Sequence, residues 1–98
     1  MLEKQKGVLF MFRLWCKTLN ENNNIISETT IEDTSDVNRT KKVMDSLSKA
    51  CADLDLAEPI WFDSNINEFK KHAKTRFRQD NFIESVSFNS FEIQVIEE

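Results

Sequence analysis

The first apolar segment of the chain, residues 8–19 with the sequence VLFMFRLWCKTL, is rich in strand-forming residues and predicts a β-strand. Successive side chains of a strand point to opposite faces of the sheet. One face of this strand is entirely apolar and is expected to meet the core: Phe10, Phe12, Leu14 and Cys16. The other face is mixed: Leu9, Met11, Arg13, Trp15 and Lys17. Because both faces carry apolar residues, we expect this strand to lie in the middle of its sheet.

A turn and a second strand are predicted next. Residues 20–24 read NENNN, and asparagine side chains bond to the nearby backbone and tolerate positive φ, as tight turns require. Residues 25–32, IISETTIE, are rich in β-branched side chains. The two apolar segments and the turn between them therefore predict an antiparallel hairpin.

The apolar period then lengthens to that of an α-helix, over about residues 36–54. The apolar arc of this helix contains Thr40, Val43, Met44, Leu47, Ala50, Cys51 and Leu54. Residues 33–36, DTSD, provide side chains that commonly cap helix N-termini. Leu56 falls outside the arc, so we expect the helix to end near Asp55.

A second helix is predicted over about residues 65–77, after a turn at Pro59. Asn65 and Glu68 have the spacing of a capping box at its start. Its apolar stripe consists of Ile66, Phe69, Ala73 and Phe77.

Residues 82–96 return to strand character. Apolar residues alternate with polar ones through Phe91, Ile93 and Val95, and again earlier at Val86 and Phe88. The pattern is compatible with one long strand containing a bulge, or with a second hairpin that turns at residues 89–90.

These elements predict a single α+β domain over residues 1–98, with residues 1–6 frayed. The order is β-β-α-α-β, with a further strand if the tail forms a hairpin. The expected architecture is an antiparallel sheet of three to four strands with both helices packed on one face.

Composition narrows the possible chemistry. Glycine and proline occur once each, which argues against a glycine-rich loop that cradles phosphate. The two cysteines, Cys16 and Cys51, are far apart and lie on predicted apolar faces, so we expect reduced core thiols. The single histidine, His72, is expected to be a partly buried structural residue, and these three residues do not make a zinc site. We therefore predict no metal, no cofactor and no catalytic constellation, and hence a protein that is not an enzyme.

The chain has no apolar segment of the length that spans a membrane, and no N-terminal segment of signal-peptide type. We therefore expect a cytoplasmic protein without a membrane partner.

The net charge of the chain is −4, yet residues 70–78, KKHAKTRFR, contain five cations and no acid. On a continuous helix, Lys70, Lys71, Lys74 and Arg78 would form one strip, with Arg76 pointing elsewhere, beside Phe69. Such a strip is typical either of a solvated helix flank or of a surface that contacts phosphates, and we favour the flank. In the binding interpretation Trp61 would stack on a nucleic-acid base, although a core position for Trp61 is the simpler expectation.

The mixed face of the first strand suggests a different kind of contact. If both helices cover the opposite face of the sheet, then Leu9, Met11 and Trp15 would form an exposed apolar patch, and such patches usually mark interfaces.

The segment PIWFDSNINEFKKHAKTRFRQDNFIESVSFNSFEIQVIE at residues 59–97, with FRLWCK at residues 12–17, resembles a small family of proteins from clostridial-type bacteria. That family has no assigned activity, so the resemblance implies a free-standing bacterial intracellular protein and transfers no site residue.

Two hypotheses follow from the residues. The first is an interaction module that binds itself or another protein through the mixed sheet face or an open strand edge. The alternative is an anion-binding or nucleic-acid-binding module that uses Trp61 and the basic segment.

Overall fold

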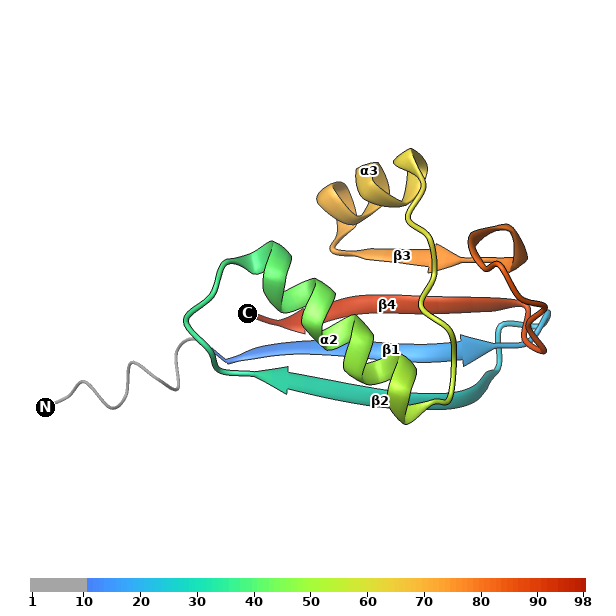
Figure 1. Ribbon diagram of the computed structural model, residues 1–98, viewed down its shortest axis with the longest axis horizontal. Helices are drawn as coiled ribbons and strands as arrows, with labels where there is room; N and C mark the ends of the chain where they lie inside the picture. Colours follow the sequence, from blue (N-terminus) through green and yellow to red (C-terminus); the bar gives the residue numbers. More distant parts are fainter. Residues whose placement is uncertain (1–10) are drawn as a thin grey trace, which may run out of the picture.

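The computed structural model describes residues 11–98, and this part of the chain folds as four strands and two α-helices (Figure 1). The elements in chain order are β1 (Phe12–Leu19), β2 (Ile25–Asp33), α2 (Arg39–Asp53), α3 (Asp63–His72), β3 (Lys74–Phe77), the short 3₁₀ helix η1 (Gln79–Asn81) and β4 (Ser90–Glu97). The predicted α+β class and the order β-β-α-α-β-β are confirmed.

The four strands form one antiparallel sheet in the order β2-β1-β4-β3. The central position predicted for the first strand is confirmed, since β1 pairs with β2 on one side and with β4 on the other. The predicted hairpin is also present, and the side-chain oxygen of Asn20 accepts hydrogen bonds from the N–H groups of Asn22 and Asn24 at 2.9 and 3.0 Å. Asn23 adopts a φ of 63°, the left-handed conformation that asparagine tolerates in turns.

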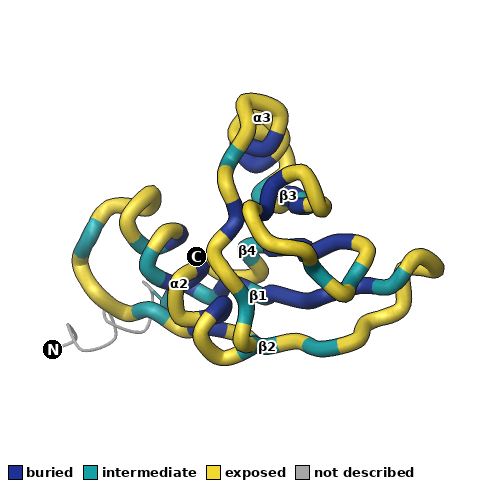
Figure 2. The backbone as a smooth tube through the Cα atoms, turned by 45° about the vertical axis from the view of Figure 1, so that its right-hand side comes forward, coloured by how far each residue is buried: buried dark blue, intermediate teal, exposed yellow. Residues whose placement is uncertain are grey.

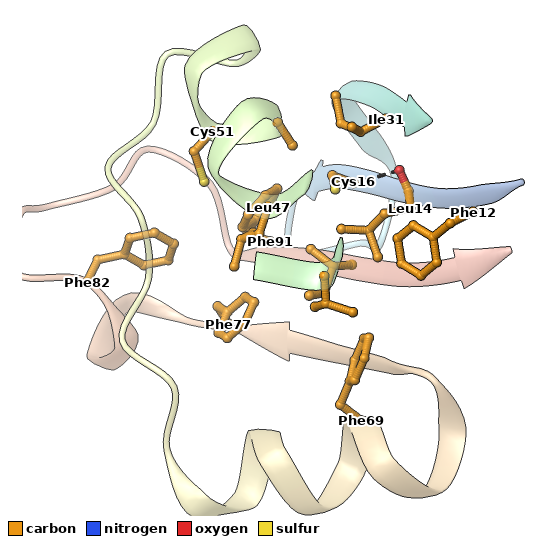
Figure 3. Close-up of a cluster of buried hydrophobic side chains, with 13 residues drawn as sticks. Phe12, Leu14, Cys16, Ile31, Leu47, Cys51, Phe69, Phe77, Phe82 and Phe91 are labelled. Carbon is orange, nitrogen blue, oxygen red and sulfur yellow. Dashed lines mark hydrogen bonds between the residues drawn. The ribbon is translucent and has the colours of Figure 1, made fainter. Parts of the chain in front are cut away.

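Both helices lie on the same face of the sheet, and one core fills the space between the layers (Figure 3). Residues directly opposite each other on neighbouring strands share a face. The register places Cys16 and Thr75 opposite Ile93, and Phe77 opposite Phe91, all on the buried face. α2 packs over β1 and β2, and α3 packs against β3 (Figure 1).

Helix α2 begins later than its sequence pattern predicts. Its N-cap is Asn38, whose side-chain oxygen accepts a hydrogen bond from the N–H of Lys41 at 2.9 Å, and not one of the residues 33–36. The helix ends at Asp53, and Asp55 has a φ of 59°, which places the break close to the predicted position. Val43, Leu47, Ala50 and Cys51 are buried as expected, whereas Thr40 and Met44 are exposed.

The second helix is shorter than predicted, and this corrects the interpretation of the basic segment. α3 ends at His72, Ala73 turns left-handed with a φ of 58°, and the chain continues as strand β3. This turn divides the predicted stripe between two elements. Phe69 on α3 and Phe77 on β3 are both buried, whereas Ile66 on α3 is 39% exposed. Tertiary pairing of β3 with β4 has overridden the local helical period.

Two further predictions for this region are corrected. Residues 82–96 contain one strand, β4, and the fourth strand of the sheet comes from residues 74–77 instead. Asn65 does not start α3. It occupies the third helical position, and its side-chain oxygen accepts a hydrogen bond from the N–H of Phe62 at 3.0 Å.

The side chain of Asn65 joins α3 to β3 and to the loop that follows. Its amide nitrogen donates to Thr75 Oγ1 at 3.0 Å and to the backbone oxygen of Arg76 at 2.9 Å. Its oxygen also accepts a hydrogen bond from the amide nitrogen of Asn81 at 2.8 Å. Asn65, Thr75 and Asn81 are all buried, so this network is shielded from water.

We expect Asn65→Ala to lower the free energy of unfolding by about 3 kcal/mol, because it leaves several buried donors and acceptors without partners. Urea denaturation followed by tryptophan fluorescence measures this change. Asn67→Ala is the matched control, since Asn67 is exposed on the same helix and its loss should cost less than about 0.5 kcal/mol. Equal losses in the two variants would contradict the role given to Asn65.

Candidate functional site

The five cations of the basic segment lie on different elements and do not form one strip. Lys70 and Lys71 are exposed on α3, Lys74 and Arg76 belong to β3, and Arg78 follows it. The predicted helical strip is wrong because the helix ends before Lys74. The register places Lys74 and Arg76 opposite Gln94 and Glu92, on the sheet face turned away from the helices.

Arg76 is engaged within the protein. Its Nε lies 3.3 Å from an oxygen of Glu92, and its terminal nitrogen donates to the side-chain oxygen of Asn23 at 2.9 Å. These contacts hold the guanidinium against the sheet, so it is less available for an external phosphate than Lys70 or Lys71.

Trp61 packs against the core, which confirms the expected core position. Its ring meets Phe69 and Phe77 edge-on, with centroids 5.6 and 5.1 Å apart. The side chain is half-buried, and its indole nitrogen is inaccessible to water and has no acceptor among residues 11–98. An unsatisfied buried donor is uncommon in folded proteins.

The predicted apolar patch would lie on the far face of the sheet, which is the face turned away from the helices, and the structure describes two of its three residues. Leu9 lies outside the described residues, while Met11 and Trp15 are half-buried. Trp15 donates from its indole nitrogen to Glu28 at 2.8 Å, and the ammonium of Lys17 lies 3.3 Å from the centre of its ring. The tryptophan is therefore covered on one side by a cation and presents less apolar surface than its sequence position suggests.

This far face carries an ordered layer of charges. Lys17 Nζ lies 3.1 Å from one oxygen of Glu92, and Arg76 binds the other. The side chains of Lys17 and Glu92 are only 9% and 10% exposed, so the pair is largely desolvated. Burial alone would raise the pKa of Glu92, but the hydrogen bonds and charges of Lys17 and Arg76 outweigh it and lower the pKa below 4.5.

One edge of the sheet is long and exposed. β2 has nine residues and pairs with β1 on one side only, and no other strand within residues 11–98 adjoins it. Most of β2 is exposed (Figure 2). Ile25 and Ile26 at its start are 45% and 57% exposed. β3, at the opposite edge, has only four residues and packs against α3. An open edge of this kind presents unpaired backbone donors and acceptors.

A groove of about 400 Å³ separates the two helices. Its lining comes from α2, α3 and the segment before α3: Arg39, Thr40, Val43, Met44, Trp61, Ile66, Phe69 and Lys70. The sequence pattern assigned Met44 and Ile66 to buried stripes, but they are 41% and 39% exposed and form walls of the groove. Apolar periodicity marks the face of a helix that turns inward and does not show whether a neighbouring helix closes over it.

The thiols and the histidine do not form a reactive centre. Burial raises the pKa of Cys16 to about 12, with a further contribution from nearby Cys51. Burial also raises the pKa of Cys51 to about 12, and the charge of Glu58 adds to it. Both thiols are free and stay protonated at neutral pH, so they are poor nucleophiles. His72 is exposed on α3, which corrects the expectation that it is partly buried.

Within residues 11–98, histidine, cysteine and acidic side chains nowhere gather in threes that could hold a metal ion. None of the helices in the same range has the length and hydropathy needed to cross a membrane.

Comparison with known proteins returned no match to a family model, to a curated protein or to a solved structure. The resemblance of residues 59–97 to a clostridial-type family therefore stays a prediction, and function is argued from the edge of β2 and the groove.

The Lys17–Glu92–Arg76 contacts predict a pH-dependent stability. Since the folded pKa of Glu92 lies below its ordinary value of 4.5, the contribution is present above that pH and is lost as the pH falls through the folded pKa. We expect Glu92→Gln to lower the free energy of unfolding by about 2 kcal/mol at neutral pH, which lies between the values for exposed and for buried ion pairs. The difference in the free energy of unfolding between this variant and the wild type should shrink in acid, because the protonated side chain of Glu92 is then as neutral as glutamine.

Urea denaturation at several pH values measures this difference. Glu97→Gln is the control, because Glu97 pairs with Arg13 at 3.2 Å on a half-exposed site and should contribute less than about 1 kcal/mol. A gap between Glu92→Gln and the wild type that stays constant from neutral pH to well below 4.5 would contradict the assignment.

Proposed function

We propose that the protein is a small interaction module that associates with a second copy of itself through the outer edge of β2. The observation that carries this proposal is the length of that edge: β2 has nine residues and a paired neighbour on one side only, within the described part of the chain. Adding a strand to such an edge satisfies the backbone groups of both chains without a change of fold.

The residues of β2 suit antiparallel pairing about a twofold axis at Thr29. In that register Thr29 faces Thr29 of the second copy, and Glu28 faces Thr30. Ile26 then faces Glu32, and Ile25 faces Asp33, so no acid lies directly opposite another acid. Threonine pairs favour antiparallel contact, whereas directly opposed like charges oppose it. Within one copy, Glu28 and Glu32 already bind Trp15 and Arg13, which reduces repulsion between their carboxylates.

Association through the sheet face is less well supported. Trp15 is covered by Lys17, and the neighbouring side chains Glu92 and Arg76 are engaged in ion pairs. Burying this face against another protein would desolvate several charges at once, which is costly unless the partner matches them.

Nucleic-acid binding by the basic segment also has weaker support. A phosphate backbone is bound by cations that lie along one surface. Here Lys70 and Lys71 lie on α3, while Lys74 and Arg76 lie on the far face of the sheet.

The proposal places this module in the cytoplasm of a bacterium and gives it no catalytic role. Two observations support it: Cys16 and Cys51 are free thiols in the core, and their raised pKa values make them unreactive. Free thiols are typical of a reducing compartment.

Substitutions of Thr30 test both the association and its register. Thr30 is exposed, so the fold should tolerate a change there. In the proposed dimer, Thr30→Lys places a cation opposite Glu28 twice, and Thr30→Glu places an acid there twice. Each cross-strand pair contributes roughly 0.2–1 kcal/mol, so the dissociation constants of the two variants should differ by about ten-fold or more, with Thr30→Lys the tighter.

Sedimentation velocity over the micromolar range measures these constants. Ile83→Glu is the control, because Ile83 is 90% exposed and lies outside the sheet, and it should leave association unchanged. A monomer at every concentration, or a dimer that both Thr30 variants affect equally, would overturn the β2-edge proposal.

A further inference from the structure

We infer that the groove between α2 and α3 is a binding site for a small molecule with an apolar body and a carboxylate head. This inference is independent of the β2 edge, since none of the residues that line the groove belongs to the sheet.

The walls of the groove favour an apolar ligand. Val43 and Met44 line it from α2, and Ile66 and Phe69 line it from α3, with Trp61 alongside. Met44 and Ile66 keep about two fifths of their surface in water, although their positions in the helical pattern would suit a core. Covering these side chains with a hydrocarbon body removes apolar surface from water, which is favourable at roughly 25 cal/mol per Å².

The charges of the groove favour an anion. Two of the eight lining residues are charged, Arg39 and Lys70, and both are cations, while the chain as a whole has a net charge of −4. Lys70 is exposed and forms no ion pair with another residue in the range 11–98. The lining residues thus include two cations and no acid, which is complementary to a single negative head group.

Arg39 is positioned to contribute. Its guanidinium carbon lies 5.4 Å from the centre of the Phe69 ring, and its Nε donates to Glu98 at 2.8 Å. The ion pair is half-exposed on both sides, so its net contribution is small and a ligand carboxylate can share or replace it.

Trp61 provides a reporter within the groove. Its side chain is part of the lining, while its indole N–H is buried and has no acceptor in the described chain. A ligand that packs against the ring should therefore change the environment of this N–H.

The size of the groove favours a small molecule. A volume of about 400 Å³ lies within the range of small-ligand sites and holds a medium-length alkyl or aryl acid. A nucleic acid would need a longer row of cations, and Lys71, which is next to Lys70, is not part of the lining.

Decanoate is a suitable probe, and decanol and decylammonium are matched probes of the same chain length. Titration of the ¹⁵N-labelled full chain, followed by ¹H–¹⁵N correlation spectra, reports on each backbone amide and on both indole N–H groups. We expect decanoate to shift the Trp61 indole signal and the amides of Val43, Met44 and Ile66 in a saturable way. The Trp15 indole is the internal control and should not shift, because it is bonded to Glu28 on the far face of the sheet.

Charge selectivity decides between a site and a merely apolar surface. We expect decanoate to bind more tightly than decanol, and decylammonium to bind most weakly. Lys70→Glu should weaken decanoate about ten-fold or more, whereas Lys71→Glu, with the same change of charge on the same helix, should change it less than about two-fold. Both lysines are exposed, so both variants should keep the dispersed spectrum of the folded protein.

Three results would overturn the inference: no saturable shift with decanoate, equal affinity for decanoate and decylammonium, or equal effects of Lys70→Glu and Lys71→Glu. The last two would show that the groove binds any apolar chain without recognising its head group.

Discussion

The arrangement of the C-terminal half depends on one buried amide, that of Asn65. Its four hydrogen bonds reach the start of α3, the strand β3 and the 3₁₀ helix η1. α3 has ten residues, which is short for a helix in water, and β3 has only four. Neither element is expected to be stable alone. The amide fixes them to one another, because any displacement of α3 from β3 would leave several buried polar groups without partners.

The groove follows from this constraint. With α3 fixed to β3, the side chain of Phe69 points into the shared core (Figure 3). Ile66 of the same helix stays partly exposed on the groove that α2 also lines. α2 is held separately, through its contacts with β1 and β2. The two helices are therefore positioned mainly by opposite halves of the sheet, and Met44 and Ile66 between them remain partly open to water.

The long elements could be predicted from sequence because each has several turns or alternations of a consistent period. β3 could not be predicted in this way, because the position of Phe77 fits both a helix and a strand. It lies four residues after Ala73, as in the stripe of a helix, and two residues after Thr75, as on one face of a strand. The helix stop at Ala73 also has no sequence signal, since the left-handed conformation there is usually taken by glycine. The candidate sites depend on pairing between distant segments. The division of the basic segment, and the presence of Lys70 and Arg39 in the lining of one groove, could therefore not be predicted without the fold.

The distribution of charge explains how an acidic chain can present a cationic groove. On the far face of the sheet, Arg13 of β1 pairs with Glu32 of β2 and with Glu97 of β4. Glu92 of β4 binds both Lys17 and Arg76, so the three acids together balance the three cations. Cations placed there contribute little field elsewhere, because their charges are matched at close range. Lys70 lies on the other side of the molecule, on a helix whose acids lie outside the lining of the groove. Most of the ion pairs are thus confined to the far face of the sheet, whereas Lys70 on the helical side forms no ion pair with another residue in the range 11–98.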